Sequence, residues 1–534
     1  MTRKASIIAA IFICGLAAIG KTENRSVAES VREANVLIIG GGLAGLAAAD
    51  ELINRMGVEN VTILEAAHRL GGRVSPQLVE HPTDNRFYIQ LGAQFLHNEE
   101  TRFSRLVQEL RLVPDEAKLD ELDHRAKLFF GRNARPLNEH DTTVLWELLY
   151  GQTLEREVER VAVRNPHRSI GWIFDEAFNR TLDKIDNPQM QGMLSDFRGI
   201  HTRYQETEFA AVDIYQASMR NWLESEDPSE VAIPLYGKGL GAVVDELVSR
   251  IPPANIRTSS RVVRIADWSS RDRVSVHLAN GDVLYADHVI VTVSLGVLKA
   301  SHPTLFSPAL PPAKIDAIEN LEFGAIDKVF LFYERPFWQS SLDYMAVAAE
   351  PVRSNSSSSL EDAFWAFTTE QFNSNAAYLL AWIGGAESVQ LVEAASEAQL
   401  ATAATNKLRA ATNFRPIPQP VKVIRTRWKS DPLFRGSYSS YSLASDEAHV
   451  SFADLAEPLV DSSNRPSVLF AGEATHSHYF QTVHGAYESG IREAERLEDY
   501  YDSANNGVGV LNRNSLSLLV SSFLSMLARL IVLL

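Results

Sequence analysis

The sequence of 534 residues contains a single cysteine, Cys14, which lies in an N-terminal apolar stretch. The rest of the chain therefore has no disulfide, no thiol nucleophile, no cysteine metal site and no attachment point for a thioether-linked cofactor. A chain without disulfides depends on its core for stability. Its length and its hydrophobic content of 45% allow a large core and predict two or more domains.

Basic residues are also scarce relative to acidic ones. Lys and Arg total 51 against 67 Asp and Glu, which gives a formal net charge of -16. Such a surface repels nucleic acid and attracts cations, so we expect no nucleic-acid partner. An acidic surface is compatible with a cationic substrate, and equally with plain solubility.

A short apolar run near the start of the chain predicts a secretory signal. Arg3 and Lys4 give it a basic start, residues 7–19 are apolar, and Ala18-Ile19-Gly20 has the small residues that a signal peptidase needs. The run is too short and wrongly flanked for a membrane span. We therefore expect residues 1–20 to be removed in the secretory pathway.

A second apolar run closes the chain. Residues 516–534 are strongly apolar with Arg529 near their end, and residues 503–507 are small and polar. Small residues, a spacer and an apolar tail match a GPI-attachment signal. A single membrane span and an amphipathic surface helix are the alternatives, because an arginine near the end of a span can reach the interface. We expect residues 503–534 to attach the protein to a membrane, outside the cell or on its surface.

Residues 36–49 predict a strand, a tight turn and a small-residue helix. Gly40, Gly42 and Gly45 stand at Gly-x-Gly-x-x-Gly spacing. The first glycine permits the turn, the second lets a pyrophosphate approach the backbone, and the third lets the helix pack closely on the strand. The next buried strand ends in Glu65, where an acidic side chain can accept hydrogen bonds from a ribose. Together these features predict a dinucleotide site.

Two later segments suit the same site. The glycines of Gly71-Gly72-Arg73 are followed by a cation, which suits a second loop around phosphate. Far downstream, a buried strand ends in Gly472-Glu473, and a loop leads to a small-residue helix that begins near Val483. The start of that helix can carry negative charge on a cofactor ring.

Strand-rich pieces at the start, middle and end of the chain are separated by two insertions. The middle piece has a hairpin turn at Asn280-Gly281-Asp282 and a buried strand at 288–293. Residues 99–234 are mostly helical in pattern, residues 50–59 continue the first helix, and residues 386–411 predict one long alanine-rich helix. The pattern predicts an α/β protein with a discontinuous nucleotide-binding domain (residues 31–115, 235–325 and 430–502) and a substrate domain of mixed sheet and helices (residues 116–234 and 326–429).

Taken together, these blocks resemble the flavin-containing amine oxidases, and most of all the polyamine and spermine oxidases among them. The resemblance implies the two-domain FAD-dependent amine oxidase fold, with a Rossmann-like FAD domain. The similar stretches are scattered over about residues 35–500: the two glycine loops, residues 91–97, residues 286–299, residues 436–439 and the block around Gly472-Glu473.

FAD is the cofactor that the resemblance implies. The monoamine oxidases of the family bind flavin covalently through a cysteine, but the matching position here is Ser437, so we expect non-covalent FAD. The implied contacts are Gly40, Gly42 and Gly45 to the pyrophosphate, Glu65 to the adenosine ribose, Gly71, Gly72 and Arg73 to phosphate, Val263 to the adenine through its backbone, Gly92 and Ala93 to the isoalloxazine, Gly472 and Glu473 to the ribityl chain or phosphate, and the backbone N–H of Val483 to a flavin carbonyl.

Lys328 and His97 are the catalytic residues that the resemblance indicates. Lys328 matches a lysine near flavin N5, where a cation stabilises negative charge; on its own it would be a strand-end lysine in solvent. His97 matches a substrate-contacting histidine and can hold or deprotonate an amine, although a lone histidine after an apolar run is more often structural. Trp428 and Tyr438 are expected in an aromatic wall that guides cations. Thr482 stands where many family members have a tyrosine, which argues for long, thin substrates.

The expected reaction oxidises a polyamine (spermine, spermidine or an N-acetylated form) to an aldehyde and a shorter amine, with dioxygen as acceptor and hydrogen peroxide as product. A secreted L-amino-acid oxidase remains as an alternative, and it needs an arginine for the substrate carboxylate that the sequence does not place. A non-catalytic surface flavoprotein is a further alternative. The signal argues against a histone demethylase. The preferred polyamine and the oligomeric state stay open, and Glu206 and Glu208 are candidate ligands for distal amines.

Overall fold

The computed structural model describes residues 31–80, 86–97, 101–116, 118–119, 125–131, 135–224, 232–347, 359–369 and 376–506. The expected signal at 1–20 and the apolar run at 516–534 lie outside these residues. Residues 503–506 form the end of the last helix, α19 (Val483–Asn506). Within the described ranges, no helix is both long and apolar enough to cross a membrane.

The first large sheet combines strands from the beginning, middle and end of the chain. Its order is β21 (Leu459–Val460), β22 (Pro466–Phe470), β12 (His288–Val291), β1 (Asn35–Ile39), β2 (Asn60–Leu64) and β8 (Ile256–Arg257). Every neighbouring pair is parallel except β21 with β22. Parallel strands need crossover connections. The helical segment 40–59 connects β1 to β2, and long insertions supply the other crossovers.

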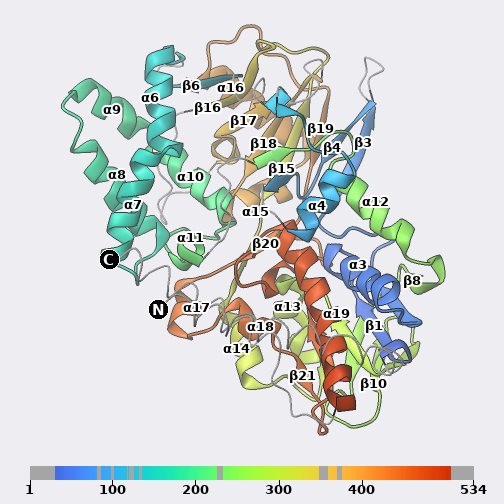
Figure 1. Ribbon diagram of the computed structural model, residues 1–534. Coiled ribbons are helices and arrows are strands. Elements are labelled where there is room, and N and C mark those ends of the chain that lie inside the picture. The colour runs from blue at the N-terminus through green and yellow to red at the C-terminus, as the bar shows by residue number, and fades with distance from the viewer. Residues whose placement is uncertain are drawn as a thin grey trace, which may run out of the picture.

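Helices cover one face of this sheet and a smaller sheet covers the other. Alternate residues of β1 point to opposite faces. Ile38 packs in one core with α3 (Leu43–Asp50), α12 (Leu240–Arg250) and α19, and Figure 1 shows α19 running beside α3. Leu37 and Ile39 pack in a second core. That core includes β11 (Val283–Ala286), β10 (Val274–Leu278), β9 (Val262–Ala266) and β13 (Phe306–Ser307), with α13 (Leu295–Leu305) and α14 (Pro312–Asn320).

The second large sheet lies on the other side of the functional cavity described below. Its order is β19 (Lys422–Arg425), β15 (Asp327–Phe332), β18 (Tyr378–Ile383), β17 (Ala366–Thr369), β16 (Leu342–Val347) and β6 (Ala126–Phe130). Val329 and Leu331 of β15 pack with α15 (Ala386–Ala394) and α16 (Glu397–Ala411). Phe330 and Phe332 face the opposite way and pack against the hairpin of β3 (Pro76–Glu80) and β4 (Arg86–Gln90).

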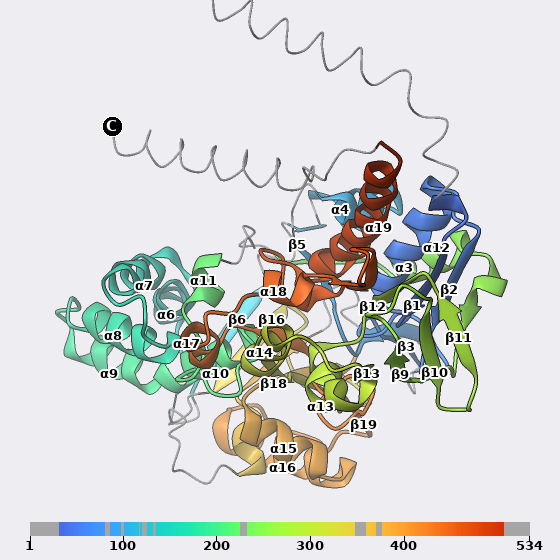
Figure 2. The same ribbon diagram turned by 90° about the horizontal axis from the view of Figure 1, so that it is seen from below.

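A helical lobe adjoins the second sheet, and Figure 2 shows it on the side away from β1, β2 and α12. Phe129 of β6 and Ala346 of β16 share its core. The lobe consists of α6 (Glu139–Tyr150), α7 (Gln152–Arg164), α8 (Ile170–Leu182), α9 (Pro188–Asp196), α10 (Arg198–Glu208) and α11 (Arg220–Glu224).

Short elements complete the described chain. They are η1 (Glu51–Arg55), β5 (Phe95–His97), α4 (Arg102–Glu109), β7 (Ala232–Pro234), η2 (Pro253–Asn255), β14 (Glu322–Gly324), η3 (Leu360–Ala363), β20 (Tyr438–Ser440), α17 (Leu443–Glu447), α18 (Phe452–Ala456) and η4 (Glu473–Thr475).

Local structure agrees with the sequence at one turn and differs at two helices. The hairpin of β10 and β11 is confirmed, with Gly281 at a φ of 95°. The helix predicted over 386–411 is two helices, because Ser396 accepts a hydrogen bond from the backbone of Gln399 and begins α16. The first helix does not continue to residue 59. It ends in the π-helical turn η1, and Gly57 at a φ of 72° redirects the chain.

All strands of the first sheet lie in the segments predicted for the nucleotide-binding domain, and all strands of the second lie in those predicted for the substrate domain. The domain boundaries themselves stay a prediction.

Candidate active site

A single cavity of about 1860 Å³ connects the first sheet, the second sheet and the helical lobe. Apart from the candidate amine ligands Glu206 and Glu208, which are described below, every predicted site residue lines it except Gly45. A Cβ atom at Gly45 would lie 2.0 Å from the carbonyl oxygen of Gly40. Gly45 therefore permits the close approach of α3 to the turn and lies behind the cavity wall, rather than on it.

Two glycine loops lie against each other at one end of the cavity. The N–H of Gly71 donates to the carbonyl of Gly41 at 2.8 Å, and Gly42 and Gly71 form an isolated bridge. Gly40 adopts a φ of 113°, which favours glycine. No side chain caps the N-terminus of α3, which opens on the cavity at Gly42. A helix N-terminus in this position binds anions.

Glu65 is tied into the first loop at the end of β2. Its carboxylate accepts hydrogen bonds from the backbone N–H groups of Gly41 at 2.6 Å and Ala67 at 2.7 Å. It lines the cavity together with Val263, whose side chain is exposed. Glu65 is thus a fixed acceptor at a cavity wall and not a solvated strand end.

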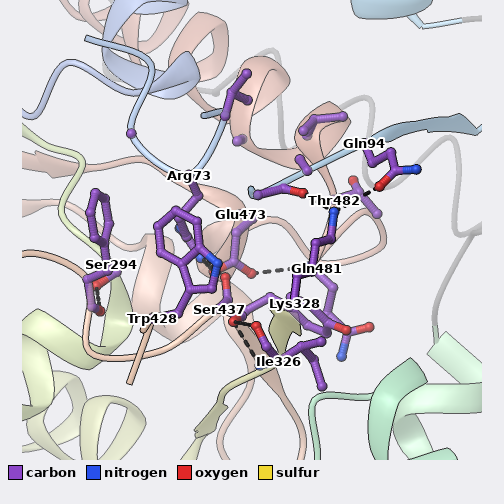
Figure 3. A pocket seen from close by; sticks show the side chains of 18 of the residues that line it. Arg73, Gln94, Ser294, Ile326, Lys328, Trp428, Ser437, Glu473, Gln481 and Thr482 are labelled. Atoms are coloured by element: carbon purple, nitrogen blue, oxygen red, sulfur yellow. Dashed lines mark hydrogen bonds and ion pairs between the residues drawn. The ribbon is translucent and has the colours of Figure 1, made fainter. Parts of the chain in front are cut away.

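Arg73 and Glu473 form an ion pair at the middle of the cavity, which Figure 3 shows from close by. Nη1 of Arg73 lies 2.9 Å from Oε1 of Glu473 and also donates to the carbonyl of Ser437 at 2.6 Å. Oε2 of Glu473 accepts from the hydroxyl of Ser439 at 2.6 Å and from the N–H of Gln481 at 3.0 Å. The predicted contact of Glu473 with a cofactor would therefore be made by a carboxylate that protein donors already fix.

Lys328 projects from β15 on the face that carries Phe330 and Phe332, toward the chain that follows β4. Its ammonium nitrogen donates to the carbonyls of Gln90 at 2.9 Å and Gly92 at 2.8 Å and to Oε1 of Gln94 at 2.9 Å. Burial lowers the pKa of Lys328 well below its ordinary value. The structure thus rules out a strand-end lysine in solvent and places Lys328 at the cavity wall beside Gly92.

Trp428, Ser437 and Tyr438 form a wall beside Lys328. The indole N–H of Trp428 donates to the carbonyl of Leu91 at 3.2 Å. The hydroxyl of Tyr438 donates to the carbonyl of Thr207 at 2.6 Å, and burial raises its pKa. The hydroxyl of Ser437 bonds to the backbone of Ile326, a hydrogen-bonded role that needs no link to a cofactor.

Thr482 and His97 line the cavity from the start of α19 and the end of β5. The Thr482 hydroxyl accepts from the N–H of Gly485 at 3.0 Å at the start of α19, where Val483 also lines the cavity. His97 ends β5, and its ring lies 6.1 Å from the ring of His484, which is buried against Phe103. This arrangement presents His97 to the cavity and backs it with packed aromatic rings.

The helical lobe contributes carboxylates to the far end of the cavity. Glu208 of α10 lines it as predicted, whereas Glu206 is buried outside it, 3.8 Å from Arg203 and against Gly385. Residues of α6 and α7 that the sequence did not single out complete this end: Trp146, Glu147 and Glu155. The charged residues of these two helices resemble those of any solvated helix face. The local sequence therefore does not indicate that these three residues line a cavity.

The model of the flavin-containing amine oxidoreductases matches residues 43–497. The chain belongs to this family. It is 28% identical to a probable polyamine oxidase 5 of Arabidopsis thaliana, over 88% of this chain and 99% of that protein. It is 26% identical to a human peroxisomal N(1)-acetyl-spermine/spermidine oxidase, over 88% of this chain and 96% of that protein.

A solved structure of a putrescine oxidase double mutant, redesigned at its cofactor-binding site, has the same fold. It superposes with a TM-score of 0.62 at 16% identity and covers 87% of this chain and 99% of its own. The α/β amine oxidase fold predicted from the sequence is therefore confirmed.

FAD is the cofactor of this flavin-containing amine oxidoreductase, and the cavity fits it. The uncapped N-terminus of α3 suits a pyrophosphate, Glu65 suits a ribose, and the segment from Gly92 to Lys328 offers a wall for a flat ring. The sequence has no cysteine after Cys14, so no thioether to FAD is available within the cavity.

Proposed function

We propose that this amine oxidoreductase oxidises polyamines with dioxygen as the acceptor. The observation that carries the proposal is the chemistry of the cavity beyond Lys328. Three carboxylates line that part, from Glu147, Glu155 and Glu208. Aromatic side chains also line the cavity, from residues that include Tyr204, Trp222 and Trp382. Carboxylates and aromatic faces both attract ammonium groups, and their spread along the cavity suits a substrate with several of them.

The same lining argues against an L-amino acid as substrate. A substrate carboxylate calls for an arginine. The described lining residues of the helical lobe and the second sheet include no arginine, and Lys328 is already engaged by three oxygen acceptors. The arginines of the cavity are Arg73, which pairs with Glu473, and Arg261 and Arg435 beside the glycine loops.

FAD supplies the redox chemistry when bound, because it accepts a hydride from the carbon next to the amine nitrogen and is reoxidised by dioxygen to give hydrogen peroxide. The protein residues place the substrate and its charges. His97 lines the cavity near Val483 and can accept a proton from the substrate ammonium, so that the nitrogen lone pair becomes available. In its ammonium form, Lys328 presents positive charge at the cofactor wall, where that charge stabilises developing negative charge.

An amine panel with product identification tests this proposal. The full-length protein, purified with FAD, is assayed for hydrogen peroxide with spermine, spermidine, N-acetylspermine, tyramine and L-leucine, and the products are identified by mass spectrometry. The proposal expects an aldehyde and a shorter amine from at least one polyamine, and no peroxide from L-leucine. Peroxide from L-leucine alone supports the amino-acid oxidase. A yellow protein that no amine bleaches without air supports a role in binding.

The two chain ends support a further proposal, that the enzyme acts outside the cell or at its surface. Residues 1–20 have the pattern of a signal peptide, and residues 503–534 that of a membrane-attachment signal. Expression in a secreting eukaryotic cell tests this. Release of the intact chain from the cell surface by phosphatidylinositol-specific phospholipase C indicates a GPI anchor. Retention of the intact chain inside the cell contradicts the proposal.

A further inference from the structure

The Lys328 ammonium group is surrounded by one short segment. All three hydrogen-bond acceptors come from residues 90–94, which run from the last residue of β4 to the residue before β5. Two are backbone carbonyls, of Gln90 and Gly92, and these are present whatever the side chains are. The third is Oε1 of Gln94 at 2.9 Å, drawn in Figure 3. Gln94 is therefore the one side-chain acceptor that the described structure gives to Lys328.

The face of Trp382 closes the fourth side. Its ring centroid lies 4.2 Å from the Lys328 nitrogen, on the neighbouring strand β18. Three oxygens and an aromatic face favour the charged ammonium, whereas burial favours the neutral amine. An ammonium has three N–H donors and so uses all three acceptors, but a neutral amine has only two. Three acceptors therefore favour the ammonium form of Lys328, and two acceptors favour the neutral amine.

Tyr438 lines the wall beside Lys328, but its hydroxyl donates to the carbonyl of Thr207. The other titratable groups face away from this nitrogen or lie farther along the segment. Asp327 precedes Lys328 in β15, and its carboxylate accepts from Thr426 and Trp428 on the opposite face. Arg425 of β19 pairs with Val329, on that same opposite face. His97 is also titratable, but it lies farther along the segment, at the end of β5. Within the described residues, no carboxylate contacts the Lys328 nitrogen. The neutral amide of Gln94 occupies the place where a carboxylate could act as a counter-ion.

We propose that Gln94 is a positioning residue that holds the Lys328 ammonium and thereby sets the pH range over which Lys328 is charged beside the flavin. The side chain of Gln94 lines the cavity next to Gly92 and Ala93, so it acts at the wall predicted for the isoalloxazine. Loss of its oxygen leaves two acceptors and favours the neutral amine. A carboxylate in its place favours the ammonium. This inference depends on bound FAD and is independent of which amine the enzyme oxidises.

The reduction potential of bound FAD tests the proposal without any amine. The potential is measured anaerobically with dithionite from pH 6 to 10, for the wild type, Gln94→Met and Gln94→Glu. A nearby cation stabilises reduced flavin, so the dependence of the potential on pH changes slope where Lys328 loses its proton. We expect this break to move by about one pH unit to lower pH in Gln94→Met and by about one unit to higher pH in Gln94→Glu.

Lys328→Met provides the control. It should abolish the break, and adding Gln94→Met to it should change nothing further. The proposal is overturned if the wild type has no break that Lys328→Met removes, if Gln94→Met leaves the break in place, or if Gln94→Met shifts the potential equally in both backgrounds. If Gln94→Met does not retain FAD, the shift in Gln94→Glu decides. A raised KM for the best amine substrate with an unmoved break assigns Gln94 to substrate binding instead, and likewise overturns the proposal.

Discussion

Arg73 and Glu473 are 400 positions apart in the sequence and form an ion pair of 2.9 Å at the cavity wall. Arg73 follows the second glycine loop, and Glu473 follows β22 of the first sheet. Glu473 is only 4% exposed. The pair therefore joins the two segments that the sequence assigns to phosphate and to the flavin side of the cofactor.

Glu473→Gln should weaken both FAD binding and the fold. An amide keeps one acceptor oxygen, but the carboxylate serves Arg73, Ser439 and Gln481 at once. Breaking a buried pair typically costs about 3 kcal/mol. Urea unfolding and fluorescence titration with FAD measure the two effects. Glu495→Gln is the control, because Glu495 pairs with Arg102 in solvent and contributes about 1 kcal/mol or less. Equal losses in the two variants would contradict the role of Glu473.

Lys328→Met should slow the flavin half-reactions while the substrate still binds. Methionine fills similar space but removes the charge that faces the cofactor wall. Loss of one preorganised electrostatic group typically lowers a rate about 100-fold. Stopped-flow absorbance follows flavin reduction by the amine and reoxidation by dioxygen separately. Because Lys328 also binds residues 90–94, a thermal melt must show that the variant is folded. Unchanged rates in both half-reactions would remove Lys328 from the mechanism.

Glu155→Gln should raise the KM of a polyamine more than that of a monoamine. Glu155 lines the far end of the cavity and can contact only a substrate long enough to reach it. A lost ion pair of about 1 kcal/mol corresponds to a rise of about five-fold. Glu206→Gln is the matched control, since that carboxylate is buried outside the cavity beside Arg203. Steady-state kinetics with spermine and with butylamine distinguish the two, and equal changes for both amines would contradict the assignment.

The geometry of the glycine loops could be predicted from the sequence because local chemistry determines it. The turn at Gly40 needs a positive φ, and the contact of Gly45 with Gly40 leaves no room for a side chain, so glycine spacing reports the geometry directly. The prediction of Lys328 depended on the family resemblance, because the sequence around a lysine in a buried strand does not indicate which groups it contacts. Only the packing of β15 against the β3–β4 hairpin, which belongs to a separate sheet, reveals that residues 90–94 surround it.

The substrate end was harder because tertiary packing decides it. Glu206 and Glu208 are two residues apart, yet only Glu208 reaches the cavity, and the sequence treated them alike. Glu147 and Glu155 are on amphipathic helices, where charges toward a cavity and charges toward solvent look the same. The break in the helix at 386–411 was missed for a different reason: Ser396 had a capping signal, but the alanine-rich pattern around it outweighed one serine.

His288 should make the protein less stable in mild acid. Its ring is fully buried, with Nδ1 2.7 Å from the carbonyl of Pro466 and Nε2 2.9 Å from the hydroxyl of Tyr501. Burial lowers the pKa of His288 from 6.5 to about 4. The unfolded chain therefore binds the proton first. The contribution of His288 is complete above about pH 6.5 and is lost as the pH falls toward 4, by about 3 kcal/mol in total.

His288→Gln removes that dependence on pH. Glutamine cannot take up a proton, so the variant should be less stable than the wild type at pH 7.5, and the difference should shrink or reverse by pH 4.5. The free energy of unfolding in urea, at pH 7.5, 6.0 and 4.5, measures the change. His140→Gln, on the exposed surface of α6, should follow the wild type at all three values. If His288→Gln loses stability with falling pH as steeply as the wild type, then His288 does not link the end of α19 to acid sensitivity.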